Sequence, residues 1–93
     1  MKFFYKRSYL KTFDHADFFT QGLIREADKV IKDYFETGQS SYGLRIKKIG
    51  AKTFEGRVTD KIRIVWIKEG NAISFVMVGD HEEVQNYLKN FEI

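Results

Sequence analysis

Two arginines and one histidine stand out in this sequence because they lie in or next to strand-like segments. Arg63 is the only charged residue in the run IRIVWI, and Arg57 lies in the preceding strand-like segment TFEGRVT. His81 follows the apolar run AISFVMV by two residues, after a glycine and an aspartate. An arginine in a central strand is uncommon without a partner or a function. These three side chains are therefore the first candidates for chemistry.

Two guanidinium groups and an imidazole suit the cleavage of a phosphodiester. Attack on phosphorus builds negative charge on the non-bridging oxygens, and arginine donors bind such oxygens in a bidentate fork. An imidazole that titrates near pH 6.5 can protonate a leaving oxygen or accept a proton from a hydroxyl. RNA carries its own nucleophile, the 2′-hydroxyl, so neither a metal ion nor a protein nucleophile is required. The three residues thus predict metal-independent chemistry on RNA.

A hairpin would bring these residues together. The apolar runs Ile62–Lys68 and Ala72–Val78 flank a Glu-Gly-Asn turn and predict two antiparallel strands. His81 then lies beside the start of the first of these strands, near Arg63. A tight Thr-Asp-Lys turn places Arg57 on the neighbouring strand in the same region. We therefore expect the three side chains to converge at one end of a sheet.

A purely structural interpretation of the same residues stays open. Arg63 could form an ion pair with Asp60, Glu55 or Asp80, all of which are close in the predicted hairpins. His81 could simply be a turn residue. Asp80 is well placed to cap a final helix, since acidic residues are favourable in the first helical turn.

The remaining segments complete an α+β pattern. Lys2–Lys6 predicts a short aromatic strand, and Ser8 is a candidate N-cap for a helix that follows it. From Phe18 onward, apolar residues recur at three- and four-residue steps, which predicts an amphipathic helix that ends at Gly38. Leu44–Ile49 alternates loosely and predicts a further strand. The expected order is one strand, two helices, four strands and one helix, with the long helix on one side of an antiparallel sheet.

Length and composition exclude several classes of protein. With 93 residues, the chain is expected to form one domain, residues 1–93. It has no cysteine, which excludes disulfides and thiolate metal sites, and two histidines do not make a zinc site. His15 is interpreted as a solvated polar residue. No run approaches the roughly 18 apolar residues of a membrane span, so we expect a cytoplasmic protein without a membrane, metal or cofactor partner.

Basic residues are concentrated in one stretch. Leu44–Arg63 contains seven lysines and arginines against Glu55 and Asp60. Such a zone is typical of a surface that contacts phosphates, although a solvated lysine-rich face has the same composition. The aromatic run Phe3–Tyr5 also leaves open a general RNA-binding domain that stacks bases on its sheet.

The stretch TFEGRVTDKIRIVWIKEGNAISFVMVGDHEEV resembles the C-terminal half of toxins of the RelE/ParE superfamily. It is most similar to the RelE/YoeB-type ribonucleases and their unpaired relatives. The shared pattern is an arginine in one strand, a short turn, a second arginine, a hairpin and a Val-Gly-x-His junction before a helix. The upstream segment GLRIKKI also fits. The resemblance covers Gly43 to Val84 in motif, and the rest of the chain only in element order.

The resemblance implies a RelE-like α+β fold, in which an N-terminal strand and two helices pack on an antiparallel sheet of about four strands, with a short C-terminal helix. It implies the toxin of a type II toxin–antitoxin system, which cleaves mRNA on the ribosome and is neutralised by a small antitoxin protein. No cofactor is implied, and homodimer formation stays open.

Residue by residue, the resemblance gives Arg57 and Arg63 the role of stabilising the phosphorane-like transition state, and His81 that of the general acid. Glu55 lies where some relatives have a lysine. It could be the general base, or it could neutralise Arg57. The basic face that would contact RNA comprises Lys47, Lys48, Lys52 and Lys61.

One departure from the family bears on activity. Active members often present an aromatic residue on the C-terminal helix to stack on a base, and Gln85 occupies the nearest equivalent position. Tyr87 or Phe91 would have to substitute for it. Two alternatives follow from the same resemblance: a catalytically inactive binding module of this fold, or a ParE-like inhibitor of gyrase.

Overall fold

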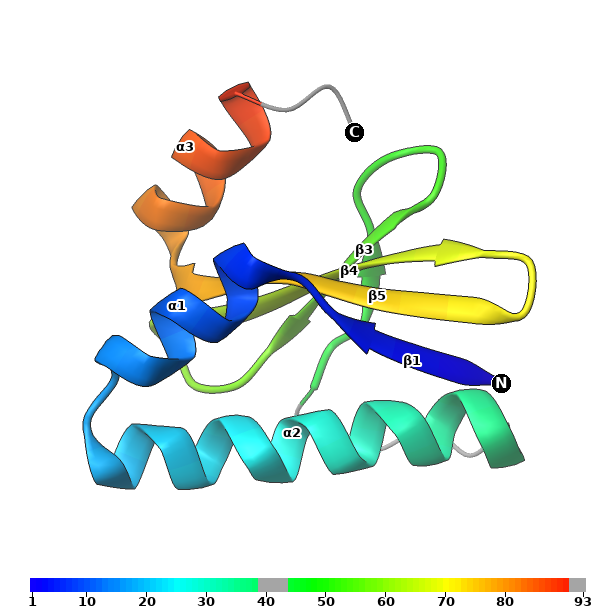
Figure 1. The fold of residues 1–93 in the computed structure, drawn as a ribbon, viewed down its shortest axis with the longest axis horizontal. Coiled ribbons are helices and arrows are strands. Elements are labelled where there is room, and N and C mark those ends of the chain that lie inside the picture. The colour runs from blue at the N-terminus through cyan, green and yellow to red at the C-terminus, as the bar shows by residue number, and fades with distance from the viewer. Residues whose placement is uncertain (39–43, 91–93) are drawn as a thin grey trace.

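The computed structural model describes residues 1–38 and 44–90. Its elements follow one another in the expected order: β1 (Lys2–Tyr5), α1 (Arg7–His15), α2 (Phe18–Thr37), β2 (Lys47–Lys48), β3 (Thr53–Arg57), β4 (Ile62–Glu69), β5 (Ala72–Asp80) and α3 (His81–Asn90). The strands form one sheet in the order β1-β5-β4-β3-β2 (Figure 1). The expected α+β class is confirmed.

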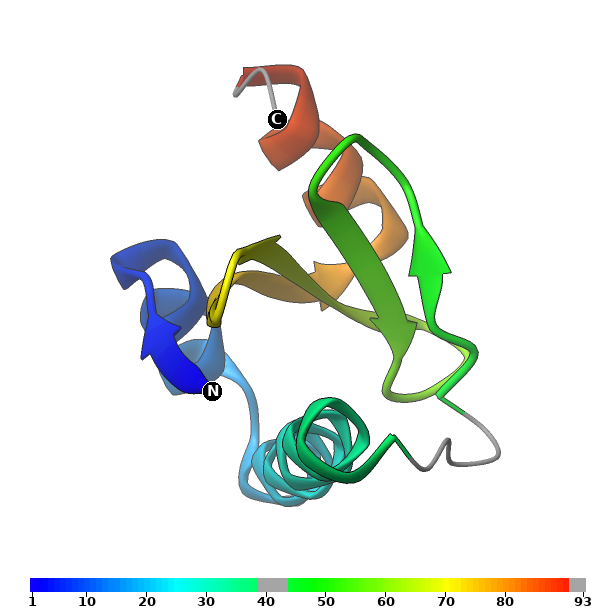
Figure 2. The same cartoon turned by 90° about the vertical axis from the view of Figure 1, so that its right-hand side faces the viewer.

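The sheet is covered on both faces. One face packs against α1 and α2 around Trp66 and Phe75, both of which are fully buried. The other face packs against α3 through a smaller cluster of Val65, Val76 and Val84. Figure 2 shows α2 and α3 on opposite sides of the strands. This second apolar face explains why the central strands have apolar residues on both sides.

The four strands from β2 to β5 pair in antiparallel fashion, as expected. We expected the N-terminal strand to pack on an antiparallel sheet of about four strands. In the structure β1 pairs with β5, and this pairing is parallel, so the sheet has five strands and is mixed. The connection from β1 to β5 contains α1, α2 and the three other strands, which is long enough for a parallel pairing.

The long helix α2 begins at Phe18 and ends before Gly38, as the sequence pattern predicts. The side chain of Asp17 accepts a hydrogen bond from the backbone N–H of Thr20 at 2.7 Å, which caps the start of α2. Gly38 has a φ of +79°, the left-handed conformation expected of a glycine after a helix.

The prediction for the first helix was wrong at its start. Lys6 occupies the N-cap position of α1 without a side-chain hydrogen bond, and Ser8 lies within the helix. The Ser8 hydroxyl instead donates a hydrogen bond to the carbonyl of Val76 on β5. Ser8 therefore ties α1 to the sheet, because a long-range acceptor competes with the local backbone for its hydroxyl.

A β-bulge interrupts the pairing of β4 with β5. Val65 pairs with Met77, but its neighbour Trp66 pairs with Phe75, so Val76 is an extra residue. An extra residue reverses the side-chain alternation beyond it. As a consequence, Val78 faces the α1 and α2 side and Gly79 faces the α3 side, opposite Arg63.

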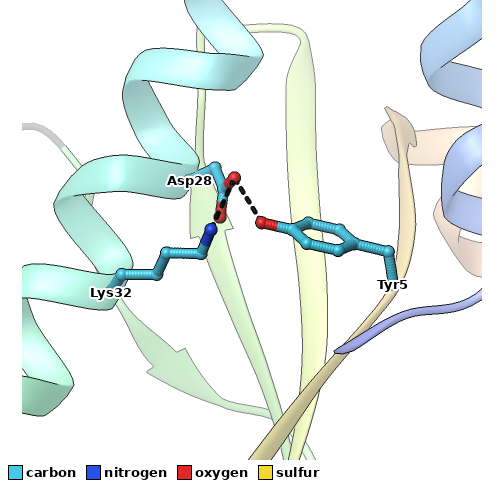
Figure 3. A network of polar contacts seen from close by, with 3 residues as sticks. All are labelled: Tyr5, Asp28 and Lys32. Atoms are coloured by element: carbon cyan, nitrogen blue, oxygen red, sulfur yellow. Dashed lines mark hydrogen bonds and ion pairs between the residues drawn. The ribbon is translucent and has the colours of Figure 1, made fainter. Parts of the chain in front are cut away.

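A polar network joins β1 to α2 (Figure 3). The Tyr5 hydroxyl donates a hydrogen bond of 2.6 Å to Oδ2 of Asp28, and the Lys32 ammonium lies 3.4 Å from the same oxygen. The Tyr5 ring stacks on Phe75 and lies 5.4 Å from the ring of Tyr9. Burial, together with the neighbouring Asp28 carboxylate, raises the pKa of both Tyr5 and Tyr9 above their ordinary value.

We expect the free energy of unfolding to fall as the pH rises above about 10, the ordinary pKa of tyrosine. The two phenols release their protons at a lower pH in the unfolded chain than in the folded one, so alkaline pH favours unfolding. Urea denaturation between pH 8 and pH 11 measures this slope. The double variant Tyr5→Phe/Tyr9→Phe should show a shallower slope, and an equal slope in both proteins would contradict this assignment.

Candidate functional site

Three neighbouring strands place the candidate residues in one row. Arg57 at the end of β3 is the direct cross-strand partner of Arg63 on β4. On its other side, Arg63 is the partner of Gly79 on β5. His81 begins α3 two residues after Gly79. The hairpins thus bring the two arginines together and place the start of α3 at the same end of the sheet.

The two arginine side chains share the face of the sheet that α3 covers. Arg63 alternates with Ile62 and Ile64, both of which pack on the α1 and α2 side, so its own side chain lies on the other face. Directly opposed residues have side chains on the same face, with Cα atoms about 4.5–5.5 Å apart. Arg57 therefore lies next to Arg63 on that face.

The Arg63 guanidinium is incompletely paired. Its Nη1 atom is buried and has no hydrogen-bond partner. In residues 1–38 and 44–90, neither Arg63 nor Arg57 forms an ion pair with a carboxylate, so the bridges to Asp60, Glu55 or Asp80 that the sequence left open are not formed. Two adjacent cations without a counter-ion are unfavourable unless an anion joins them. The chemistry of this pair suits a phosphate.

The backbone that leads into His81 is fixed by a capping box. The Asp80 carboxylate accepts a hydrogen bond of 2.8 Å from the N–H of Glu83, and the Glu83 carboxylate accepts one of 2.9 Å from the N–H of Asp80. Asp80 is thus the N-cap of α3, as the sequence predicts. A Cβ atom at Gly79 would lie 2.9 Å from the Glu83 carboxylate, so this reciprocal arrangement needs a glycine. His81 itself is exposed.

Glu55 lies two residues before Arg57 on β3, and its side chain is on the same face of the sheet as that of Arg57. Its cross-strand partners are Val65 on β4 and Lys47 on β2. In the part of the chain that the structure describes, Glu55 forms no ion pair with Arg57. Glu55 is half-buried.

The four lysines predicted to bind RNA are all exposed but do not form one group. Lys61 lies in the turn next to the arginine row, and Lys47 and Lys48 form β2 at the edge of the sheet. Lys52 lies before the opposite end of β3, five residues or roughly 17 Å from Arg57 along the strand. Its ammonium is 3.4 Å from the Glu69 carboxylate. Lys52 is therefore separated from the arginine row.

The candidates for base stacking on the C-terminal helix differ in position. Gln85 is exposed on α3, whereas Tyr87 is half-buried and packs with Leu88 against the apolar cluster beneath the helix. Phe91 lies outside the described residues. Tyr87 therefore contributes to the packing of α3 against the sheet.

One further arginine at this end was not singled out from the sequence. Arg45 is exposed and has a φ of +47°, a left-handed conformation that is unfavourable for residues other than glycine. The carbonyl of the preceding Leu44 accepts a hydrogen bond of 2.6 Å from the N–H of Arg57. Strained backbone is often found at functional sites. No sequence signal marks this conformation, because glycine would be the usual residue there.

In the described ranges, no three His, Cys, Asp or Glu side chains lie together in a way that could hold a metal ion. None of the helices found there is both long and apolar enough to cross a bilayer.

No protein-family model matches the chain, and no curated protein sequence matches it significantly. Solved structures do match. A copper-bound mutant toxin from Helicobacter pylori has a TM-score of 0.70 and 17% identity, and the match covers 90% of this chain and 98% of that one. The RelB–RelE antitoxin–toxin complex from Methanococcus jannaschii gives 0.67 and 19%, with 90% and 96% covered. The DinJ–YafQ complex from E. coli gives 0.71 and 10%, with 89% and 96% covered.

These matches extend over nearly the whole of each toxin chain, at low sequence identity. They show that the chain has the fold of the RelE, YafQ and YoeB-type toxins, as the resemblance implied. They do not test the roles of individual residues, which stay predictions.

Replacing Arg63 by methionine should raise the free energy of unfolding by about 1–3 kcal/mol. The substitution keeps an unbranched side chain and removes a buried donor without a partner beside a like charge. Urea denaturation measures the change. Inorganic phosphate should raise the melting temperature of the original protein and not that of the variant. A destabilised Arg63→Met protein would contradict the unpaired state of this guanidinium.

Replacing Gly79 by alanine should lower the free energy of unfolding by about 1 kcal/mol or more, because the new Cβ displaces Glu83 and opens the capping box. Faster amide hydrogen exchange in the first turn of α3 would accompany it. Gly22→Ala is the matched control: its Cβ has open space within α2, and helix propensity predicts a gain of up to about 1 kcal/mol. Equal effects of the two substitutions would contradict the role of Gly79.

Proposed function

We propose that this protein is the toxin of a toxin–antitoxin pair and that it cleaves mRNA on the ribosome. The observation that carries the proposal is the row of Arg57, Arg63 and Gly79, with a buried guanidinium nitrogen that lacks a partner. The shared toxin fold supports it. A pair of unneutralised arginines at one end of a sheet is a suitable cradle for the scissile phosphate of an RNA strand.

In the proposed reaction, the 2′-oxygen of the RNA attacks the adjacent phosphorus, and the bond from phosphorus to the 5′-oxygen breaks. The products are a 2′,3′-cyclic phosphate and a free 5′-hydroxyl. Glu55 accepts the proton of the 2′-hydroxyl, and His81 gives a proton to the leaving 5′-oxygen. Arg57 and Arg63 bind the non-bridging oxygens, whose negative charge grows in the transition state. Nothing in this reaction calls for a metal ion.

The exposed lysines near the row extend the contact with RNA. Lys47, Lys48 and Lys61 would bind neighbouring phosphates and position the strand without selecting a sequence. Lys52 is engaged with Glu69 at the far end of β3 and contributes less. The proposed site of action is the ribosome in the cytoplasm. A small antitoxin protein is the proposed partner that blocks the toxin, since RelE and YafQ are found in complexes with RelB and DinJ.

A second candidate function is a non-catalytic module of the same fold, or an inhibitor of gyrase. The observation that favours it is the surface of α3. Gln85 lies where active members often have a stacking aromatic residue, and Tyr87 packs against the apolar cluster beneath the helix. A module of this kind would bind its partner or RNA without cleavage, and a gyrase inhibitor would cause DNA damage.

Induced expression of the protein should stop growth and translation, and mapped mRNA ends should show cleavage in translated codons. His81→Ala should lower the cleavage rate by about 10²–10⁴-fold, the typical contribution of a general acid. Arg63→Ala should lower it by about 10²–10³-fold, as for the loss of one donor to a developing oxyanion. Primer extension on translated mRNA in a cell-free system measures these rates, and cleavage should persist with a chelator of divalent ions.

Lys52→Ala is the control for the loss of a basic residue, because Lys52 lies away from the arginine row and should leave cleavage within about threefold of the original. Full toxicity of both His81→Ala and Arg63→Ala would refute the proposed site. Harmless expression with retained RNA binding would select the non-catalytic module. A DNA-damage response without mRNA cleavage would select a gyrase inhibitor.

A further inference from the structure

A cavity of about 320 Å³ lies at the same end of the sheet as the arginine row but on the opposite face. It opens between the α1–α2 junction and the start of α3, which lie near each other in Figure 1. Its floor is apolar and is formed by Ile24, Ile62 and Val78. The volume is within the usual range for binding sites. The arginine side chains lie on the other face, and of the arginine row only Gly79 contributes to the cavity lining.

Two exposed phenylalanines lie next to cavity-lining residues in the sequence. Phe18 and Phe19, in the first turn of α2, are 85% and 76% exposed. They lie between Asp17 and Thr20, both of which line the cavity. Adjacent aromatic side chains with this exposure do not contribute to the core, and an exposed apolar patch beside a hollow is typical of an interaction site.

The rim of the cavity is acidic. Asp17 and Glu83 line it from opposite sides, and both are exposed. The hydrogen bond from the Thr20 N–H lowers the pKa of Asp17, which keeps this carboxylate charged. The neighbouring positions along the chain add three exposed carboxylates, Asp14, Asp80 and Glu82, and two exposed lysines, Lys11 and Lys61. The basic side chain in the lining is His15.

We propose that this cavity is a docking site for a basic segment of a partner protein. An apolar side chain of that segment would enter the cavity and pack against Phe18 and Phe19, and flanking lysines or arginines would face Asp17 and Glu83. The charge excludes two other occupants. Carboxylates on the rim repel the phosphates of RNA, and a symmetric pair of copies would bring two acidic rims face to face. This proposal does not depend on the nuclease activity.

Selection from a displayed library of random peptides tests the proposal. The intact protein is the target, and the variant Phe18→Ser/Phe19→Ser is used for counter-selection. We expect the enriched peptides to share a leucine, isoleucine, methionine or phenylalanine between lysines or arginines. Synthetic copies of these peptides should shift the amide resonances of Thr20, Val78 and Glu83 in ¹⁵N spectra.

Three variants separate the contributions to binding of an enriched peptide. Phe18→Ser/Phe19→Ser should weaken it about tenfold or more, as for the loss of a hot spot. Asp17→Asn/Glu83→Gln keeps acceptors for both capping hydrogen bonds and removes the charges, so binding should weaken about three- to tenfold at low salt, with a smaller effect at high salt. Phe4→Ser is the control, because Phe4 is 50% exposed on β1, away from the cavity lining.

Several results would overturn the proposal. Failure to enrich any peptide that depends on Phe18 and Phe19 would do so, as would the enrichment of acidic peptides. A single-stranded RNA oligonucleotide that shifts the same amides would instead assign the surface to nucleic acid. Concentration-dependent dimers of the protein that the double phenylalanine variant abolishes would assign it to a second copy. The nuclease assay above is unaffected by any of these outcomes.

Discussion

The register of three antiparallel strands is the constraint on which the candidate site depends. The pairing of Arg57 with Arg63 follows from the short turn between β3 and β4. The pairing of Arg63 with Gly79 follows from the register of the hairpin that β4 forms with β5. The bulge at Val76 then decides on which face Gly79 lies. A shift of one residue in either pairing would turn a side chain to the opposite face of the sheet. The site is thus built by backbone hydrogen bonds, and the side chains follow from them.

The arginine row contains a destabilising feature at the proposed phosphate site. A buried guanidinium nitrogen without a partner lowers the stability of the free protein, and a neighbouring like charge adds to the cost. A bound phosphate would interact with both arginines at once. The destabilisation that the unpaired arginines cause in the free protein would then contribute to the affinity for phosphate. Trp66, Phe75 and the aromatic cluster around them supply the surrounding stability. The stability of this core therefore allows the protein to tolerate the unpaired guanidinium at the end of the sheet.

Local features of the fold could be predicted from the sequence, but long-range ones could not. The cap at Asp80 and the glycine after α2 depend on residues within a few positions of each other, and both are confirmed. The parallel pairing of β1 and the bulge in β5 depend on contacts between distant segments, which periodicity does not report. The same limit applies to the site. The short turn predicted the arginine pair, whereas the ion pair of Lys52 with Glu69 depends on the register between β3 and β4.

The start of α3 connects the two surfaces at this end of the sheet. Glu83 lines the acidic cavity, and its carboxylate also accepts the hydrogen bond from Asp80, the residue immediately before His81. A partner that binds to Glu83 in the cavity would compete with that hydrogen bond or reinforce it, and would so alter the first turn of the helix that carries the histidine. The connection spans a few residues and needs no large movement. A protein ligand in the cavity would therefore act on the backbone that carries the proposed general acid without contacting the arginine side chains.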